Sequence, residues 1–281
     1  MAIDKTENIV STFETEQHVL KLRTVEPSDA VDIEEISKLI YAKDQAWTKE
    51  SIMKLLDMFP EGQICIEDKG KVIVIDTGPD FRQQMLRANV QQLDAIVYTH
   101  EHKDHIAGLD DVRAFNYQQK KEMDIYATPD VQAAIIREFH YAFSTFKYPG
   151  VPELALHTIG NEIFKIGEIS FLPINVKHYM MPVKAFRIHN FTYITDANKI
   201  EDEELEKIKG SEIIVINALR KTNHISHFNL TEAIALLEKL KPKKAYITHM
   251  SHLMGKHNDV QKELPNFINL AYDGLVINCR T

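Results

Sequence analysis

Four potential metal ligands lie within six residues of this chain, in the motif THEHKDH at residues 99–105. Imidazoles and carboxylates are good ligands for Zn, Mn and Fe. In a tight loop, His100 and His102 can point to one side, and Asp104 with His105 to the other. This spacing favours two adjacent metal ions over one. A polar surface turn rich in histidine is the weaker interpretation.

Three more side chains of ligand type each end a predicted strand. His178 ends the stretch INVKH, Asp196 ends FTYITD, and His249 ends KKAYITH. Strand ends are rigid and lie along one rim of a sheet, so a site that draws on several elements is built there. Each of the three is weak evidence alone, because polar residues often cap turns. Together with residues 99–105 they supply seven ligands, enough for two metal ions and a water.

The elements that must position these residues alternate along the chain, with strands in runs and helices between the runs. A hairpin is expected at Gln63–Asp76, a strand at Ala95–Thr99, a strand-rich stretch at 162–195 with separate strands at 168–173 and 175–178, and a last hairpin at Asn269–Asn278. Helices are expected near 82–88, 109–116, 129–140, 202–209, 230–240 and 259–264, and further strands at 125–128, 212–217 and 244–249. This pattern favours an α/β (α+β) class with packed sheets and helices outside.

The motif THEHKDH resembles the HxHxDH signature of the metallo-β-lactamase superfamily, and the later His, Asp and His follow in that superfamily's order. Within it, the chain resembles the PhnP-like phosphodiesterase group, which includes the cyclic phosphoribosyl phosphate diesterase of phosphonate breakdown. The closer resemblance is carried by IDTGPDFRQQMLR, THEHKDHIAGLDDVRAFNY, TYITDAN, NHISHFNLTEA and ITHMSH. It covers about residues 62–281 and implies an αββα sandwich, preceded here by an atypical strand-helix-helix segment.

The resemblance implies a dinuclear centre with two divalent ions, Zn or Mn. Its seven ligands would be His100, His102 and His178 on one ion, Asp104, His105 and His249 on the other, and Asp196 bridging them. Such ions lower the pKa of a shared water, whose hydroxide attacks phosphorus, and they neutralise developing charge.

His227 lies 22 residues before His249, on a loop that starts a helix. In the enzymes that the chain resembles, a His at this place protonates the departing alkoxide. His224 is the weaker candidate, and a solvent contact at a helix start is the alternative role for His227. Asp104 is expected to serve catalysis as well as metal binding. Asp76 is expected to orient a ligand.

The first sixty residues depart from the family pattern. Residues 1–17 are expected to be a weakly ordered lead-in, and residues 18–61 a separate segment ahead of a hydrolase domain at 62–281. Residues 19–70 resemble the opening of a GNAT-type N-acetyltransferase: a strand, two short helices, then PEGQICIEDKGKV. The glycine-rich loop with which that family binds pyrophosphate is absent, so acetyl transfer is not expected.

Composition limits the partners. Lys plus Arg number 33 and Asp plus Glu 41, a formal net charge of −8. Binding to phosphate backbones depends on Lys and Arg, so nucleic acid is not an expected partner. There is no apolar run of roughly 20 residues, no signal pattern, and only two cysteines, Cys65 and Cys279. We expect a cytoplasmic protein with a small-molecule substrate and no membrane partner, with a homodimer as one expected assembly.

The expected function is a metal-dependent phosphodiesterase acting on a small cyclic or nucleotide-like phosphodiester. Three alternatives stay open: the same fold hydrolysing a thioester, lactone or β-lactam; transfer-RNA 3′-end processing; and a metal-binding but inactive protein. The acidic charge and the lack of a basic arm weigh against RNA processing. Metal content without turnover would select the inactive alternative.

Overall fold

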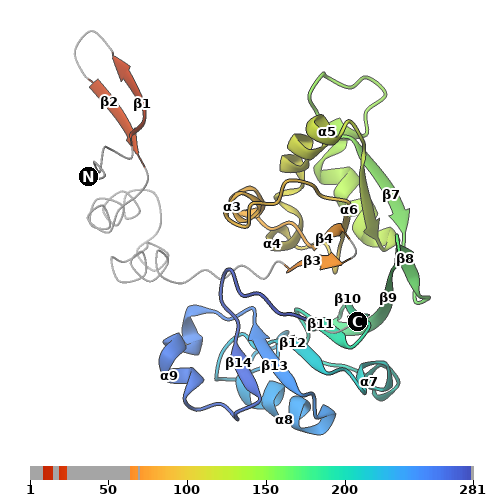
Figure 1. The fold of residues 1–281 in the computed structure, drawn as a ribbon, viewed down its shortest axis with the longest axis vertical. Coiled ribbons are helices and arrows are strands. Elements are labelled where there is room, and N and C mark those ends of the chain that lie inside the picture. Colours follow the sequence, from red (N-terminus) through yellow and green to blue (C-terminus); the bar gives the residue numbers. More distant parts are fainter. Residues whose placement is uncertain (1–8, 15–18, 24–63, 69, 280–281) are drawn as a thin grey trace. The chain divides into compact units, whose positions relative to one another are not determined.

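The computed structural model describes residues 9–14, 19–23, 64–68 and 70–279 (Figure 1). The chain divides into two compact units, Met1–Phe59 and Pro60–Thr281. In the first, β1 (Ile9–Glu14) and β2 (Val19–Arg23) pair as an antiparallel two-stranded sheet. The predicted lead-in therefore contains a strand. The two helices predicted after β2, and most of the GNAT-like stretch, lie outside the described residues.

The second unit begins with a five-stranded sheet in the order β3-β4-β5-β6-β7. Its strands are β3 (Ile64–Asp68), β4 (Lys71–Ile75), β5 (Ala95–Val97), β6 (Met123–Ala127) and β7 (Leu154–Thr158). β3 and β4 form the predicted antiparallel hairpin, and the other pairs are parallel. The sequence did not predict β7, because LALHT holds one β-branched residue and is only partly buried.

A second sheet has seven strands in the order β14-β13-β12-β11-β10-β9-β8. They are β8 (Phe164–Ile166), β9 (Ile169–His178), β10 (Met181–Ile188), β11 (Phe191–Ile194), β12 (Ile213–Asn217), β13 (Lys244–Thr248) and β14 (Ile268–Leu270). β8 to β11 pair antiparallel, and β11 to β14 pair parallel.

Two predictions in this sheet are wrong. β9 runs through Pro173, where the sequence predicted a break. Its partner β8 pairs only with residues 169–171, so next to Pro173 a missing N–H costs no ladder bond on that side. The last hairpin does not form: β14 pairs parallel with β13, and residues 271–279 hold no strand. Ile268 and Leu270 are buried, whereas Val276 is largely exposed and has no core to join.

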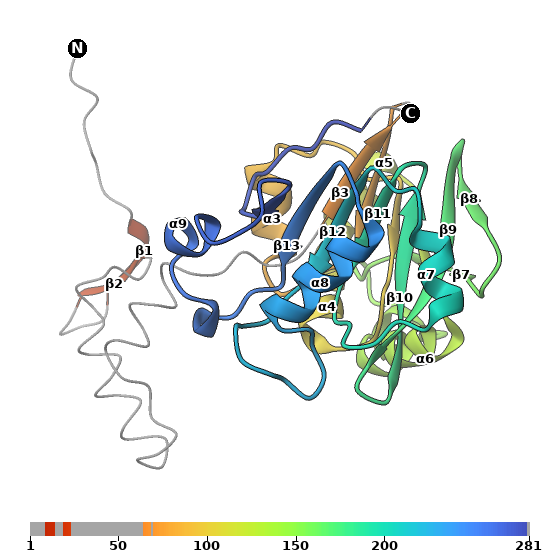
Figure 2. The ribbon, with the colours of Figure 1, turned by 90° about the horizontal axis from the view of Figure 1, so that it is seen from below.

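Helices cover the outer faces of both sheets (Figures 1 and 2). With the first sheet lie α3 (Phe81–Arg87), α4 (Lys103–Ile106), η2 (Leu109–Val112), α5 (Arg113–Gln119), α6 (Pro129–Glu138) and η3 (His140–Ala142). With the second lie α7 (Asp202–Ile208), α8 (Leu230–Leu240), η4 (His252–Met254) and α9 (His257–Gln261). Among the described residues, no helix is both long and apolar enough to cross a membrane.

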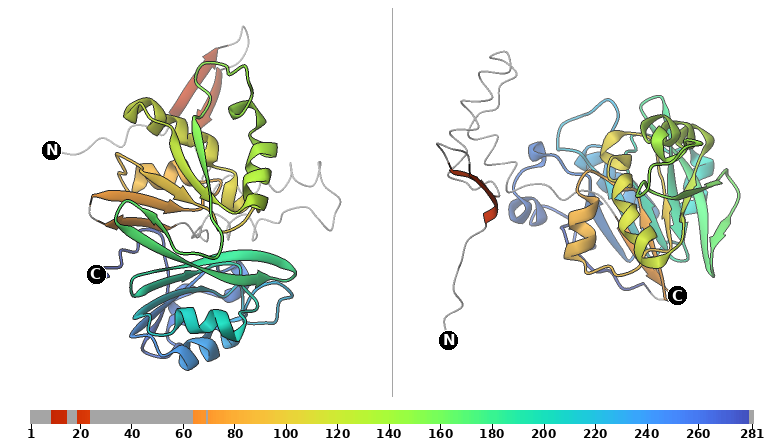
Figure 3. Two further views of the ribbon diagram at one scale, coloured as in Figure 1. Left: turned by 90° about the vertical axis from the view of Figure 1, so that its right-hand side faces the viewer. Right: turned by 90° about the horizontal axis from the view of Figure 1, so that it is seen from above.

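Three buried apolar clusters define four layers. One cluster joins the first sheet to its helices, and another joins the second sheet to α7, α8 and α9. The third lies between the sheets, with Ile73 and Val97 of the first sheet packing in the same cluster as Phe171 and Phe186 of the second. Figure 3 shows the two sheets side by side with helices outside. The predicted αββα sandwich is therefore confirmed.

Candidate metal centre

The first part of the site is the loop after β5. The chain passes through buried His100 to α4, and His102 is the N-cap of this short helix. One helical turn brings His105 back beside His100, with ring centroids 4.1 Å apart. Thr77 N–H donates to the His105 carbonyl oxygen at 2.7 Å, so the loop after β4 holds α4 in place.

This contact between loops requires a glycine. A Cβ at Gly108 would lie 2.2 Å from the carbonyl oxygen of Gly78. Gly108 N–H also donates to Thr77 O at 2.9 Å. Only a residue without a side chain lets the loop that carries Asp76 approach α4 so closely.

The second part of the site comes from strand ends. β9, β11, β12 and β13 run in one direction, because β10 is antiparallel to β9 and β11 and the later pairs are parallel. Their C-terminal ends therefore meet at one edge of the sheet. His178 ends β9, Asp196 lies two residues beyond β11, and His249 follows β13. The topology thus gathers ligands that are 71 residues apart in the sequence.

Three site residues have backbone angles that favour glycine. The φ angle is 63° at Asp76, 51° at Asp196 and 56° at His249. Each such residue costs of the order of 1–3 kcal/mol and persists where the surroundings fix it, often at functional sites. At Asp196 the fixing group is Asn217, whose side chain accepts from Ala197 N at 2.8 Å and donates to Ala197 O at 3.0 Å.

The spacing of the ligand atoms fits bound metal. Asp196 Oδ2 lies 3.4 Å from His100 Nε2 and 3.4 Å from His105 Nε2. Asp196 Oδ1 lies 3.2 Å from His249 Nδ1, and Asp104 Oδ2 lies 3.4 Å from His105 Nε2. Ligands about 2.0–2.1 Å from one tetrahedral ion are about 3.3–3.4 Å from each other. These contacts are long for hydrogen bonds and match the edges of a coordination shell.

All seven predicted ligands come together, in three groups whose ligand atoms lie within 4.8 Å of one another. The groups are Asp104, His105, Asp196 and His249; His100, His102 and Asp196; and His178, Asp196 and His227. Asp196 belongs to all three, which is the position of a bridging ligand. His178 is grouped with His227, and its ring also lies 5.0 Å from that of His102.

Hydrogen bonds aim the imidazoles into the centre. His105 Nδ1 donates to Asp76 Oδ2 at 2.7 Å. His100 Nδ1 donates at 2.9 Å to Thr99 Oγ1, which donates in turn to Asp76 Oδ2 at 2.7 Å. The buried Nε2 atoms of His100 and His105 have no hydrogen-bond partner. Buried nitrogens without partners are costly, and here they point at the place where a metal ion would bind them. The donor set therefore fits divalent metal.

The pKa values of three of the ligands are shifted in the directions that favour metal binding. Burial lowers the pKa of His100 and of His249, which keeps both imidazoles neutral at pH 7. Burial alone would raise the pKa of Asp196, but the surrounding histidines, His249 foremost, hold it well below its usual range. Neutral imidazoles and ionised carboxylates are the forms that bind metal.

His105 is the exception. Burial would lower its pKa, but Asp76, Asp104 and Asp196 raise it well above the usual value. In the metal-free protein the His105 ring therefore favours its charged form, with a second ring proton that a divalent ion must displace when it binds.

His227 lies against this cluster. Its ring is 4.4 Å from that of His178 and stacks at 5.0 Å on that of His249. Burial and the neighbouring histidines lower the pKa of His227 to about 3, and its buried Nδ1 has no partner. α8 begins directly after this segment, with a capping box between Asn229 and Glu232. The ring of His224 lies 5.0 Å from that of His227.

Several residues that support the site were not predicted from the sequence. Asn217 holds the chain beyond Asp196, and Ser226 accepts from His178 Nδ1 through its carbonyl oxygen at 2.8 Å. Asn198 donates to Ile225 O at 2.9 Å. An amide that ends the apolar strand IIVIN was a detectable signal for Asn217, whereas a backbone carbonyl such as that of Ser226 leaves none.

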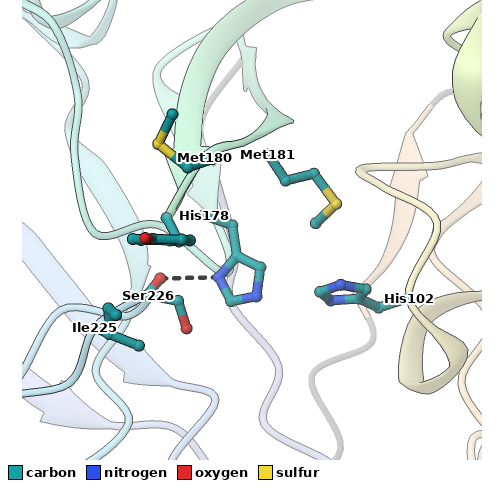
Figure 4. A pocket seen from close by; sticks show the side chains of 7 residues that line it. His102, His178, Met180, Met181, Ile225 and Ser226 are labelled. Carbon is teal, nitrogen blue, oxygen red and sulfur yellow. Dashed lines mark hydrogen bonds between the residues drawn. The ribbon is translucent and has the colours of Figure 1, made fainter.

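A pocket of about 370 Å³ opens beside the cluster (Figure 4). Its lining residues are His102, His178, Tyr179, Met180, Met181, Ile225 and Ser226. Figure 4 shows the rings of His102 and His178 next to each other, with Met180 and Met181 on one side of them and Ile225 beyond His178. A substrate bound at the centre would therefore extend into a mainly apolar space.

Known proteins share this architecture. Residues 71–250 match the model of the β-lactamase superfamily domain. A crystal structure described as a new diphosphatase from the PhnP family is 33 % identical, with a TM-score of 0.73 over 78 % of this chain and 85 % of that chain. Zinc-bound PqqB from Methylobacterium extorquens, 17 % identical over 77 % of this chain and 87 % of that chain with a TM-score of 0.61, shares the fold.

A curated relative has a different name. An octanoyltransferase of Porphyromonas gingivalis is 35 % identical over 214 residues, which are 75 % of this chain and 43 % of that protein. The chain thus spans less than half the length of this relative. The superfamily match and the PhnP-family neighbour confirm the resemblance drawn from THEHKDH: the chain belongs to the β-lactamase superfamily and has the metallo-β-lactamase fold, close to the PhnP-like proteins.

Proposed function

We propose that this hydrolase cleaves a phosphodiester or diphosphate bond at a dinuclear centre of Zn or Mn. The single observation that carries the proposal is Asp196, whose carboxylate is shared by every ligand group. A shared carboxylate suits two ions, and two-ion sites are well matched to phosphoryl transfer because they hold both the attacking and the leaving oxygen. The PhnP-family diphosphatase supports a phosphorus substrate.

Seven residues would hold the ions: His100, His102, His178, Asp104, His105, His249 and Asp196. When bound, two divalent ions lower the pKa of a water and neutralise charge on the phosphoryl oxygens. Asp76 keeps His105 and, through Thr99, His100 in the tautomer that presents Nε2. Asn217 holds the backbone of Ala197, next to Asp196, and so fixes the place of the carboxylate that the three ligand groups share.

His227 is proposed to assist the leaving group. With a pKa near 3, its ring is neutral at pH 7 in the free protein. A bound phosphate anion beside the ring raises this pKa, so that the ring takes up a proton from water; the imidazolium then gives this proton to the leaving oxygen as charge develops there and returns to the neutral form. Asp104, the other residue expected in catalysis, is proposed to act as a ligand in the group with His249.

A second candidate is hydrolysis of an acyl ester or thioester. The apolar pocket beside the centre favours it, and so does the octanoyltransferase relative, because an octanoyl group is an apolar acyl chain. RNA processing gains no such support, since the formal charge of −8 opposes binding to a phosphate backbone.

One assay separates the candidates. Protein loaded with Mn or with Zn is offered bis(p-nitrophenyl) phosphate and, separately, p-nitrophenyl octanoate, each beside a chelated sample and an Asp196→Asn variant. We expect chelator-sensitive release of p-nitrophenol from the phosphodiester alone. Turnover of the octanoate alone would replace the proposal with acyl hydrolysis. Two bound metal ions without turnover of either would reject both.

A further inference from the structure

The pocket is built from two segments that meet beside the centre. Tyr179 and Met180 form the tip of the β9–β10 hairpin, because His178 pairs with Met181. Ile225 and the residue after it come from the loop before α8. His178 both lines the pocket and belongs to a ligand group with Asp196. A group in the pocket would therefore lie next to the centre where a substrate phosphoryl group would bind.

Large apolar side chains are exposed here. Tyr179 is 56 % exposed, Met180 79 % and Ile225 67 %. Exposed apolar groups gathered beside a polar centre mark a binding surface. Of the seven lining residues, all of which the structure describes, none is Lys, Arg, Asp or Glu. A substituent that carries a further phosphate or carboxylate would find no charged partner among them.

The tip residue is held in a costly conformation. Tyr179 has φ of 57°, a region that bulky residues seldom adopt and that two-residue hairpin turns usually fill with Gly, Asn or Asp. Tyr179 in this conformation is one of the residues that line the pocket. Keeping a tyrosine where glycine would be more stable indicates that the ring itself has a use.

One side chain ties the two walls together. Asn198 accepts from Tyr179 N at 2.8 Å and donates to Ile225 O at 2.9 Å. It stands two residues after Asp196. Its own N–H donates to Lys177 O at 2.9 Å, in β9. The separation of the walls and their position relative to Asp196 are thereby fixed before any ligand binds.

We propose that this pocket selects substrates whose substituent is an uncharged planar ring, aryl or heteroaryl, on the phosphoryl group. A planar ring gains most of its contact on one face, which suits a pocket whose side chains Tyr179, Met180 and Ile225 are each more than half exposed. Methionine sulfurs also make favourable contacts with rings. An aliphatic chain would leave most of its surface in water on so open a surface. The proposal refines the substrate class and rests on the proposed function.

Phosphonates that cannot be hydrolysed test it. Calorimetric titration of the metal-loaded protein compares phenylphosphonate, methylphosphonate, 4-carboxyphenylphosphonate and octylphosphonate, and the methyl NMR signals of Met180 and Met181 report where they bind. We expect phenylphosphonate to bind about tenfold more tightly than methylphosphonate, as burial of one ring face would give. 4-Carboxyphenylphosphonate should lose most of the extra affinity that phenylphosphonate has over methylphosphonate. Only the ring compounds should shift both methionine signals.

Three variants assign the preference. Tyr179→Gly removes the ring and relieves the strain of the positive φ, so the variant should fold at least as stably as the wild type. Its preference for phenylphosphonate over methylphosphonate should fall below about threefold. Ile225→Ala should lower the preference with unchanged binding of methylphosphonate. Ile163→Ala is the matched control, because Ile163 is 61 % exposed and does not line the pocket. A preference that survives Tyr179→Gly and Ile225→Ala would overturn the proposal.

The remaining outcomes are also decisive. Tighter binding of octylphosphonate than of phenylphosphonate would show an acyl pocket, and equal binding of phenyl- and methylphosphonate would show no selective pocket. Each of these overturns the proposal. Because no bond is cleaved, a ring preference without phosphodiesterase turnover would reject the proposed function alone and leave the pocket assignment intact.

Discussion

His105 Nδ1 donates to Asp76 Oδ2 at 2.7 Å, and Asp76 also accepts from Thr99 N at 2.9 Å. One carboxylate therefore fixes both a ligand ring and the start of the loop that carries it. In Asp76→Asn one side-chain oxygen still accepts hydrogen bonds, but the amide nitrogen that replaces the second oxygen cannot accept any. We expect affinity for Zn to fall by about 10- to 100-fold, as for other groups that orient a metal ligand. Competition with a zinc chelator measures it.

Asp94→Asn is the control for that change. Asp94 also accepts a backbone N–H in the same sheet, that of Val72 at 2.9 Å, but it has no part in the metal groups. Its substitution should lower stability without changing Zn affinity. Equal losses of affinity in the two variants would show that Asp76 acts through the sheet alone.

Asn217→Ala tests a residue that belongs to none of the ligand groups and is hydrogen-bonded to the backbone beside Asp196. The substitution leaves the N–H of Ala197, a fully buried residue, without its partner, at a cost of about 1–3 kcal/mol, while the C=O of Ala197 still accepts from Phe228 N at 2.7 Å. Because Asp196 then loses its fixed position, we expect the bound metal to fall from about two ions to one or fewer. Elemental analysis after gel filtration measures it. Unchanged stoichiometry in the folded variant would show that Asp196 needs no such support.

Much of the ligand set could be predicted because its residues stand in short local sequence patterns. THEHKDH places four of them in one loop, and His178, Asp196 and His249 each end an apolar run. The sequence does not predict the residues that aim them. Asn217 acts on Ala197, 20 residues earlier, through backbone groups of a neighbouring strand end. Such pairings depend on the strand order of the sheet, which a linear pattern does not contain.

The fold errors have the same origin. β7 is short and partly buried, so its alternation is weak, and only its parallel pairing with β6 identifies it. The residues after β14 contain turn signals and apolar residues, which is why a hairpin was predicted. In the structure β14 finds a parallel partner in β13 instead. Local patterns predicted the layers, whereas the choice of partner was decided by long-range packing.

Glu204, which is remote from the metal ligands, makes the stability of the protein depend on pH. This residue of α7 accepts from Asn175 N at 2.8 Å and pairs with Lys207 at 2.8 Å, which ties α7 to β9. Burial would raise the pKa of Glu204, but Lys207 and Asn175 lower it overall from 4.5. A depressed folded pKa stabilises the protein above the unfolded value, and this stability is lost as pH falls through the folded pKa.

Glu204→Gln should therefore lower the free energy of unfolding of the metal-free protein by about 1–2 kcal/mol at pH 7. The difference from the wild type should shrink as pH falls below 4.5. Urea titrations across this range measure it. Glu203→Gln, on the exposed side of α7, should change stability by less than about 0.5 kcal/mol at any of these pH values. A pH-independent difference for Glu204→Gln would assign its effect to packing.

His227→Ala tests the proton donor through the leaving group. If His227 protonates the departing oxygen, its loss should matter most when that oxygen is strongly basic. We expect about a 100-fold or greater fall in kcat/KM for a phenyl phosphodiester, and less than about tenfold for the p-nitrophenyl analogue. The metal content should stay at two ions, because the other two ligand groups do not include His227. His224→Ala, at the neighbouring ring, should slow both substrates by similar small factors. Equal losses on the two substrates with His227→Ala would instead assign His227 to binding the phosphoryl group.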